Sequence, residues 1–237
     1  MLKECIEKIE SMSGPKLVNF KGLVFSDKPI SLITEPHVAR IELATLTGLV
    51  DLIKAKVECL DLEKWILHVL SFSEVCLIEK QTDAYGRRTT LVESCHSDGQ
   101  PFQFGHFLDR EKFVIGLQSR FAATPDLTET LKIASNLTAS TVAQAEDDGI
   151  AQRTTVKQGV TLKDNVTVKA RVTLKPYRTF REVDQPESEF IFRLRSLDGG
   201  VPECALFEAD GGKWKLDAVL IIKKWLESHQ LGMTVVA

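Results

Sequence analysis

Two stretches in the second half of the chain alternate apolar and other residues with a strict period of two. Their apolar positions are Val166, Val168, Ala170, Val172 and Leu174 in the first, and Phe190, Phe192 and Leu194 in the second. Successive side chains of a β-strand point to opposite faces, so this period predicts two strands that each bury one face. A chain with these strands must build a sheet and cover one side of it.

Basic residues follow the other side of the same strands and the segment between them. They are Lys169, Arg171, Arg178, Arg181, Arg193 and Arg195. Acidic residues lie close to them in the sequence, so one interpretation is a salt-bridged pair of strands. The alternative is that the arginines reach the acids of a neighbouring subunit or the phosphates of a ligand, because a guanidinium fork binds both. All six are candidate binding or subunit-contact residues.

The segment 65–95 predicts a long β-hairpin. Its two runs of β-forming residues flank a polar turn that contains Gly86. The tip carries Arg87 and Arg88, which we add to the candidate contacts because they could touch a phosphate or a neighbouring subunit. Solvent-facing turn charge is the simpler interpretation of this pair.

Several other segments predict helices. An apolar stripe with spacings of three and four runs from Leu43 to Val57 and indicates a helix that packs into a core. Further helices are expected over 2–10, from an Asp109 cap to about 121, from an Asp126 cap to about 145, and around 214–225. A strand is expected over 17–25, and the residues after about 230 are expected to form a loose tail.

These elements together predict an α+β fold with a mixed or antiparallel sheet, a long hairpin and packed helices. We divide the chain into an N-terminal arm of helix and strand (1–36), a segment with a helix, the hairpin and further helices (37–149), and a β-rich segment closed by a C-terminal helix (150–237). No Gly/Ser-rich linker separates them, so we expect a single compact unit or two intimately packed subdomains. The helix of the arm is a candidate assembly element.

Charge and hydropathy exclude several classes of protein. The chain has 30 basic and 33 acidic residues, which removes the overall positive field on which nonspecific duplex binding depends. No stretch approaches the ~20 apolar residues of a membrane span, and the N-terminus does not resemble a signal peptide. The five cysteines are widely spaced without a CxxC pair, so neither a disulfide framework nor a zinc site is predicted. We therefore expect a cytoplasmic protein with no membrane partner.

The loop 96–107 contains three phenylalanines, Phe102, Phe104 and Phe107, that alternate with other residues. We expect them to fill the edge of a core. Stacking on nucleic-acid bases is the alternative, but such platforms normally lie beside clustered Lys or Arg.

The sequence offers no clear catalytic site. Gly211-Gly212 lies between a predicted strand and helix, but the phosphate-loop spacings are missing, and Glu208 and Asp210 would repel a phosphate there. A closely packed turn is the preferred interpretation. Glu182, Glu208 and Asp210 would form a metal cluster only if the fold brought them together. We predict no enzyme activity, no metal and no cofactor.

Five segments together resemble a known group of proteins. They are TLTGLVDLIKAK (45–56), FVIGLQSRF (113–121), DDGIAQ (147–152), LKPYRTFREVDQPESEFIFRLR (174–195) and CALFEADGGKWK (204–215). The chain resembles uncharacterised early-region proteins of phages and prophages of Gram-positive bacteria, and its layout is distantly similar to the DUF2303 group of prophage proteins. The resemblance implies an accessory role and brings no catalytic residues with it.

Three hypotheses follow for the function. The first is a non-enzymatic accessory protein that self-assembles as a homo-oligomer, such as a ring or shell. The second is a recombination or replication accessory protein that binds single-stranded DNA through the basic strand face. The third is a sponge that sequesters a host immune nucleotide in an arginine-lined pocket between subunits.

Overall fold

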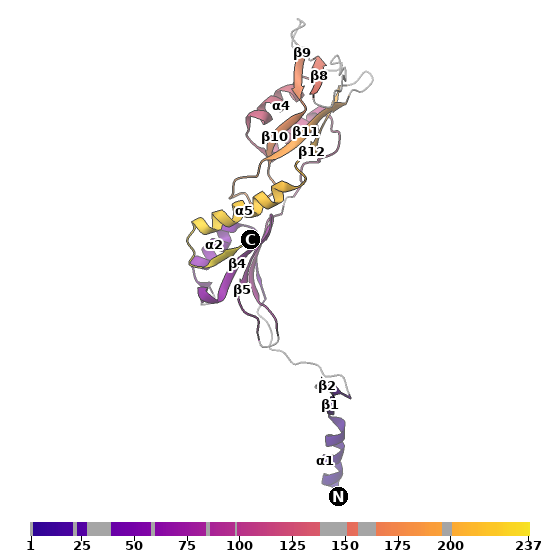
Figure 1. Ribbon diagram of the computed structural model, residues 1–237, viewed down its shortest axis with the longest axis vertical. Helices are drawn as coiled ribbons and strands as arrows, with labels where there is room; N and C mark the ends of the chain where they lie inside the picture. The colour runs from indigo at the N-terminus through magenta and orange to yellow at the C-terminus, as the bar shows by residue number, and fades with distance from the viewer. Residues whose placement is uncertain are drawn as a thin grey trace. The chain divides into compact units, whose positions relative to one another are not determined.

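The computed structural model describes residues 2–20, 23–27, 39–57, 60–83, 86–97, 99–137, 151–155, 165–195 and 201–237. Contacts group the chain into two units, Met1–Val38 and Ala39–Ala237. The larger unit combines helices with a mixed and an antiparallel sheet, which confirms the predicted α+β class (Figure 1). The expected boundary near residue 149 falls outside the described residues.

In the described residues of the N-terminal unit, 2–20 and 23–27, there are one helix and one hairpin. Helix α1 (Leu2–Ser13) precedes strands β1 (Leu17–Phe20) and β2 (Leu23–Ser26), which pair antiparallel. The Lys16 N–H donates to the Asp27 carboxylate at 2.7 Å and closes the open end of the hairpin. The prediction of one strand over 17–25 is wrong, because two short strands can satisfy each other's backbone groups and a single strand cannot.

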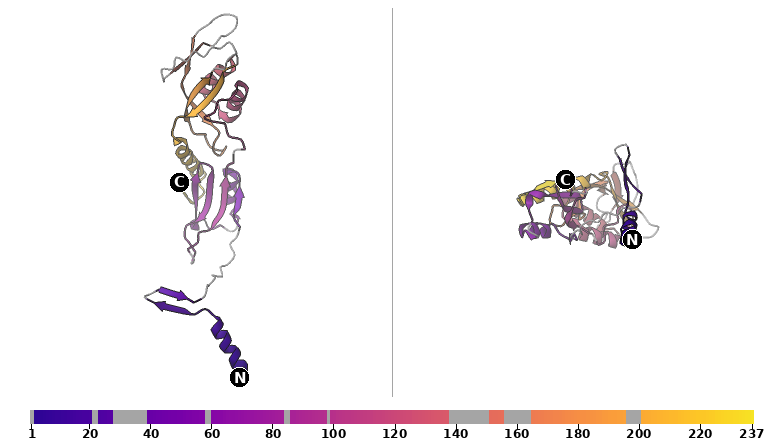
Figure 2. Two further views of the ribbon diagram at one scale, coloured as in Figure 1. Left: turned by 90° about the vertical axis from the view of Figure 1, so that its right-hand side faces the viewer. Right: turned by 90° about the horizontal axis from the view of Figure 1, so that it is seen from below.

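The larger unit contains a five-stranded sheet in the order β13-β4-β5-β6-β3, and Figure 2 shows its purple and magenta strands side by side. Strands β4 (Trp65–Ser71), β5 (Glu74–Glu79) and β6 (Thr90–Cys95) are antiparallel neighbours. Strands β3 (Ile41–Leu43) and β13 (Thr234–Val236) run parallel to β6 and β4. The predicted hairpin therefore holds three strands, since a second turn at 72–73 divides its first run.

The expectation of a loose C-terminal tail is wrong. Strand β13 pairs with β4 at the edge of the sheet, with Val235 opposite Leu67. Gly232, just before it, adopts a φ of 71°, a conformation that glycine accommodates without strain. Sequence patterns miss such strands because three residues are too few to show a period.

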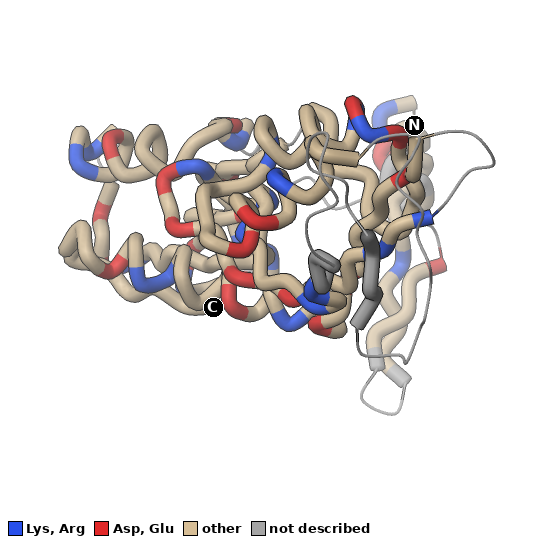
Figure 3. Tube along the Cα trace, turned by 90° about the horizontal axis from the view of Figure 1, so that it is seen from above, with Lys and Arg blue, Asp and Glu red and all other residues tan. Residues whose placement is uncertain are grey.

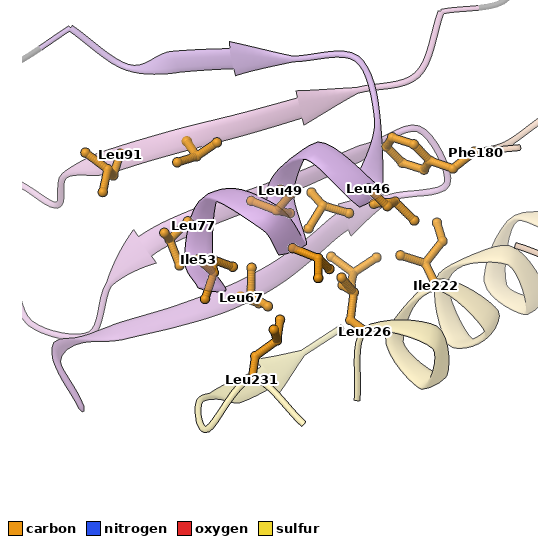
Figure 4. Close-up of a cluster of buried hydrophobic side chains, with 14 of the residues drawn as sticks. Leu46, Leu49, Ile53, Leu67, Leu77, Leu91, Phe180, Ile222, Leu226 and Leu231 are labelled. Atoms are coloured by element: carbon orange, nitrogen blue, oxygen red, sulfur yellow. The ribbon is translucent and has the colours of Figure 1, made fainter. Parts of the chain in front are cut away.

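Helices α2 (Leu46–Lys54) and α5 (Lys213–Ser228) share one core with this sheet (Figure 4). Its buried side chains include Leu46, Leu49 and Ile53 from α2, Leu67 and Leu77 from the strands, and Ile222 and Leu226 from α5. The helix predicted over 43–57 is shorter than expected. The Thr45 hydroxyl accepts the Gly48 N–H at 3.1 Å and caps α2, while Leu43 belongs to β3.

A second sheet, in the order β12-β11-β10-β7, forms another core with α3 (Arg110–Arg120) and α4 (Pro125–Ser135). Its strands are β7 (Phe121–Ala122), β10 (Arg171–Pro176), β11 (Ser188–Arg195) and β12 (Glu203–Glu208). Phe190, Phe192 and Leu194 are buried along β11, which confirms the period of two. The first predicted strand is divided at Ala170 into β9 (Asn165–Lys169), paired with β8 (Ala151–Thr155), and β10.

The two helices of this layer differ in how well their predicted caps agree with the structure. Asp109 caps α3 as expected, accepting the Lys112 N–H at 2.9 Å. Thr124, and not Asp126, caps α4, and the helix ends at Ser135 instead of near 145. Asp126 accepts the Thr173 N–H of β10 at 2.8 Å, so its carboxylate joins α4 to the sheet. The Asp147-Asp148-Gly149 turn lies outside the described residues.

Candidate functional site

Most of the predicted basic contacts on the strand face are paired within the chain. Arg171 lies 3.2 Å from Glu189, Arg195 pairs with Glu203, and Lys169 lies 2.8 Å from Glu129. All three basic side chains are more than half exposed. Figure 3 shows basic and acidic positions interspersed along the chain trace. The outer strand face is thus a set of surface ion pairs, each worth little in stability.

The hairpin-tip arginines also contact their own turn. The Arg87 Nε lies 2.6 Å from the Asp83 carboxylate, and the Arg88 Nη1 donates to the backbone carbonyls of Glu79 and Lys80. Arg193, on β11, has a buried Nη1 without a hydrogen-bond partner among the described residues. None of these three residues lines the cavity described below.

Arg178 differs from the others in being buried. Its side chain is only 10 % exposed, and its Nη1 lies 2.5 Å from the Glu208 carboxylate. The guanidinium carbon lies 4.5 Å from the ring centre of Trp214 and 4.6 Å from that of Phe104, so aromatic faces stabilise the charge. Burial lowers the pKa of Arg178, whereas Glu208 and then Asp210 act to raise it.

The loop between β10 and β11 holds Arg178 in place through a buried amide. The Gln185 Oε1 accepts the Arg178 N–H at 3.0 Å and the Thr179 N–H at 3.3 Å. Its Nε2 donates to the carbonyls of Phe180 at 2.9 Å and Val183 at 3.2 Å. One side chain therefore satisfies four backbone groups and fixes the shape of the loop.

Two further contacts join this loop to the five-stranded sheet and its helix. The Thr179 hydroxyl donates to the Phe72 carbonyl, and the Glu182 carboxylate accepts the Leu46 N–H at 2.9 Å. A carboxylate at the first turn of α2 suits the positive end of the helix dipole. Glu182 thus binds a helix terminus while Glu208 pairs with Arg178. In the part of the chain that the structure describes, no three potential metal ligands come together.

A cavity of about 610 Å³ adjoins Arg178. Its basic residues are Arg120, Arg178, Arg181 and Lys215, and its aromatic residues are Phe72, Phe102, Phe104, Tyr177 and Trp214. One acidic residue, Glu208, is among the described residues that line it. Four cations against one carboxylate make this a positive site on a chain whose net charge is −3.

The first turn of α5 also lines the cavity. Gly211 and Gly212 have φ values of 63° and 84°, so both glycines are needed for the turn between β12 and the helix. The Gly212 N–H donates to Asp210 Oδ1 at 3.0 Å. No side chain of the described residues caps α5 at Gly212. Of the two acids expected to repel an anion here, Glu208 is engaged by Arg178, whereas Asp210 binds this turn through Oδ1 and has a buried Oδ2 without a hydrogen-bond partner among the described residues.

Only some of the residues that line this cavity were predicted from the sequence. Arg178 and Arg181 were among the eight predicted contacts, but Arg120, Lys215 and Trp214 were not. The cavity residues come from segments up to about 140 positions apart, between Phe72 and Lys215, and no local pattern relates them. Phe102 is buried in the second core, as predicted, and Phe104 stacks on Phe190 with 5.0 Å between ring centres.

The N-terminal unit presents a second candidate surface, which is apolar. On α1 the exposed fractions are 81 % for Leu2, 55 % for Ile6 and 67 % for Ile9. On the hairpin, Val18 lies opposite Phe25, and both are more than half exposed. Contiguous exposed apolar side chains on a short unit indicate an interaction surface.

The remaining findings concern membrane-spanning helices and similarity to known proteins. None of the helices in the described ranges combines the length and the apolar composition that crossing a bilayer requires. Comparisons of the chain with protein-family models, with curated proteins and with solved structures find no match.

Proposed function

We propose that this protein is a non-enzymatic accessory protein, of the phage type that its sequence resembles, and that it works as a homo-oligomer. The observation that carries this proposal is the exposure of large apolar side chains on the N-terminal unit. Helix α1 and the β1–β2 hairpin form the contact between copies in this account.

The N-terminal unit has little means of folding stably alone. Isolated helices shorter than roughly 12–15 residues are marginal in water, and α1 has 12. A lone two-stranded hairpin is marginal as well. Burying a large apolar side chain stabilises a structure by about 1.5–3 kcal/mol. Leu2 and Ile9 are mostly exposed, so they contribute little of this stabilisation to the unit alone. A surface that covers α1 and the hairpin would supply the missing stability.

A second copy of the same chain fits the sequence of α1. Its exposed residues Leu2, Cys5, Ile9 and Met12 follow one another at intervals of three, four and three. This is the spacing of a two-heptad coiled-coil seam, which an identical helix can complement. Lysines and glutamates mix along the rest of α1, so two copies would not repel strongly. A repeated contact of this kind closes into a symmetric dimer, ring or shell.

Single-stranded DNA binding has less support in the structure. Lys169, Arg171 and Arg195, three of its proposed contacts, each pair with a carboxylate of this chain. Binding DNA through them would require breaking those pairs.

Light scattering after size-exclusion chromatography tests the proposal. We expect the full chain at micromolar concentration to have a mass that is a multiple of 26.5 kDa. Ile9→Asp, which places a charge on the seam, should reduce that mass. Leu216→Asp is a matched control, because Leu216 on α5 is 70 % exposed and Ile9 is 67 % exposed. A strictly monomeric wild-type protein, or equal loss of mass in both variants, contradicts the proposal.

A further inference from the structure

We propose that the cavity beside Arg178 binds a small anionic ligand with a planar ring, of the nucleotide class. The proposal is independent of self-association, because every residue that it uses lies in the larger unit.

The first argument is a buried cation with unsatisfied donors. The Arg178 side chain is nine-tenths buried, and only its Nη1 has a carboxylate partner. Its Nε and Nη2 are buried and have no hydrogen-bond partner among the described residues. Buried donors are almost always paired in native proteins, so Nε and Nη2 lack an acceptor; both are closed off from solvent, and a ligand in the cavity that Arg178 lines would reach them only as the side chain shifts. Phosphate oxygens suit a guanidinium because they accept two parallel N–H bonds.

The second argument is the charge around the cavity. Arg120, Arg181 and Lys215 line it together with Arg178, and Glu208 supplies one negative charge. Cations gathered around one space repel one another unless an anion joins them. The bound partner should therefore carry at least one full negative charge.

The third argument is the first turn of α5. Helix α5 is 16 residues long, and no side chain caps it at Gly212 in the described part of the chain. The Gly212 N–H donates to Asp210 Oδ1, the Lys213 N–H to the Asp210 carbonyl and the Lys215 N–H to the Gly212 carbonyl, so this turn attracts an anion mainly through the positive end of the helix dipole. Gly212, Trp214 and Lys215, from this turn, all line the cavity. Arg178 and the N-terminal end of α5, which belong to different elements, therefore both favour a negatively charged ligand.

The fourth argument concerns the planar ring. Tyr177 is a partly exposed aromatic residue of the cavity wall, and a face of this kind stacks on bases, whereas the Trp214 ring is buried against Arg178. The Arg181 guanidinium carbon lies 4.2 Å from the Tyr177 ring centre, which extends the stacking surface. Ser73, Ser97 and Gln100 add hydrogen-bonding groups for a sugar or a base edge. A volume of about 610 Å³ is suited to a ligand larger than a free phosphate.

Isothermal titration calorimetry on the full chain tests this site. The probes are the four ribonucleoside monophosphates and triphosphates, adenosine, inorganic phosphate and a short oligothymidylate. We expect at least one nucleotide to bind more tightly than both adenosine and phosphate, and its affinity to fall with added salt. Lys215→Gln should weaken that binding by about tenfold, because it removes a charged donor.

Lys213→Gln is the matched control, because Lys213 lies on the same helix turn but does not line this cavity. It should leave the affinity unchanged, and neither variant should change the oligomeric mass. The proposal is overturned if no nucleotide binds at millimolar concentration. It is also overturned if phosphate binds as tightly as every nucleotide, if only the oligonucleotide binds, or if both lysine variants weaken binding equally.

Discussion

Arg178 and Glu208, which lie at the ends of two different β-strands, form an ion pair with 2.5 Å between Nη1 and Oε1. Arg178 follows β10, and Glu208 is the last residue of β12. The rings of Phe104 and Trp214 pack against the same guanidinium, so the pair and the aromatic contacts stabilise one another. This cluster ties α5 to the second sheet, because Trp214 belongs to the first turn of the helix.

Arg178→Ala should lower the free energy of unfolding by about 2–3 kcal/mol, through the loss of a buried ion pair and of cation–π contacts. The exposure of Glu208, at 45 %, limits the loss because water can solvate the remaining carboxylate. Urea denaturation followed by circular dichroism measures the change. Arg171→Ala is the control, and its surface pair should contribute less than about 1 kcal/mol. An equal loss of unfolding free energy in the two variants would show that the buried Arg178 pair stabilises the fold no more than a surface pair does.

Gln185→Ala should destabilise the larger unit by about 2–4 kcal/mol, because it leaves several buried backbone groups without partners. The same change at Gln103, which is exposed, should have little effect. Thermal and urea unfolding of the two variants measure the difference. A Gln185→Ala protein as stable as the wild type contradicts the role assigned to this amide.

Gly116→Ala should destabilise the protein, although alanine is the better helix former by about 1 kcal/mol. A Cβ at Gly116 of α3 would lie 2.8 Å from Cε2 of the buried Phe102 ring. Overpacking of this kind typically costs about 1–3 kcal/mol. At Gly99 a Cβ meets no described atom within 4 Å, so Gly99→Ala should be close to neutral in the same unfolding assay. A more stable Gly116→Ala variant would show that Phe102 is free to move.

Asp109 should make the stability of α3 depend on pH. Its hydrogen bonds from Lys112 hold the pKa of the Asp109 carboxyl below its ordinary value. The stabilisation is therefore present above the unfolded-state pKa of about 3.9 and is lost as the pH falls through the lower folded-state pKa. Asp109→Ala should cost about 1 kcal/mol at pH 7. Unfolding experiments should show that this difference shrinks below pH 4, and a pH-independent difference contradicts the assignment.

These cases show which features the sequence alone could predict. The Asp109 cap and the alternation along β11 are local, so neighbouring residues were enough to predict them. The cap of α4 was misassigned because Thr124 and Asp126 are both good capping residues, and only the contact of Asp126 with Thr173 separates them. Strand β13 and the cavity depend on contacts between distant segments. The sequence therefore gave no signal for β13 and, for the cavity, singled out Arg178 and Arg181 but not Arg120, Lys215 or Trp214.

The cysteines offer a direct probe of the N-terminal contact. Cys5 on α1 is exposed, whereas Cys76 and Cys204 are buried. Burial raises the pKa of both buried thiols to about 12, and burial together with Glu93 raises that of Cys95 to about 11. Thiolates are the reactive form, so at pH 7.5 we expect a maleimide to modify Cys5 before these three in the Ile9→Asp variant, whose seam is open, and more slowly in the assembled wild-type protein. Mass spectrometry after timed quenching measures the order, in a Cys59→Ser background.

Cross-linking through Cys5 tests the central claim most directly. In a Cys59→Ser, Cys95→Ser variant, a short bismaleimide should join two full-length chains at Cys5, because the proposed seam brings two α1 helices together. Ile9→Asp in the same background should abolish the cross-linked dimer, and Leu216→Asp should preserve it. A protein that labels fully at Cys5 but yields no cross-linked dimer at micromolar concentration would contradict assembly through this helix.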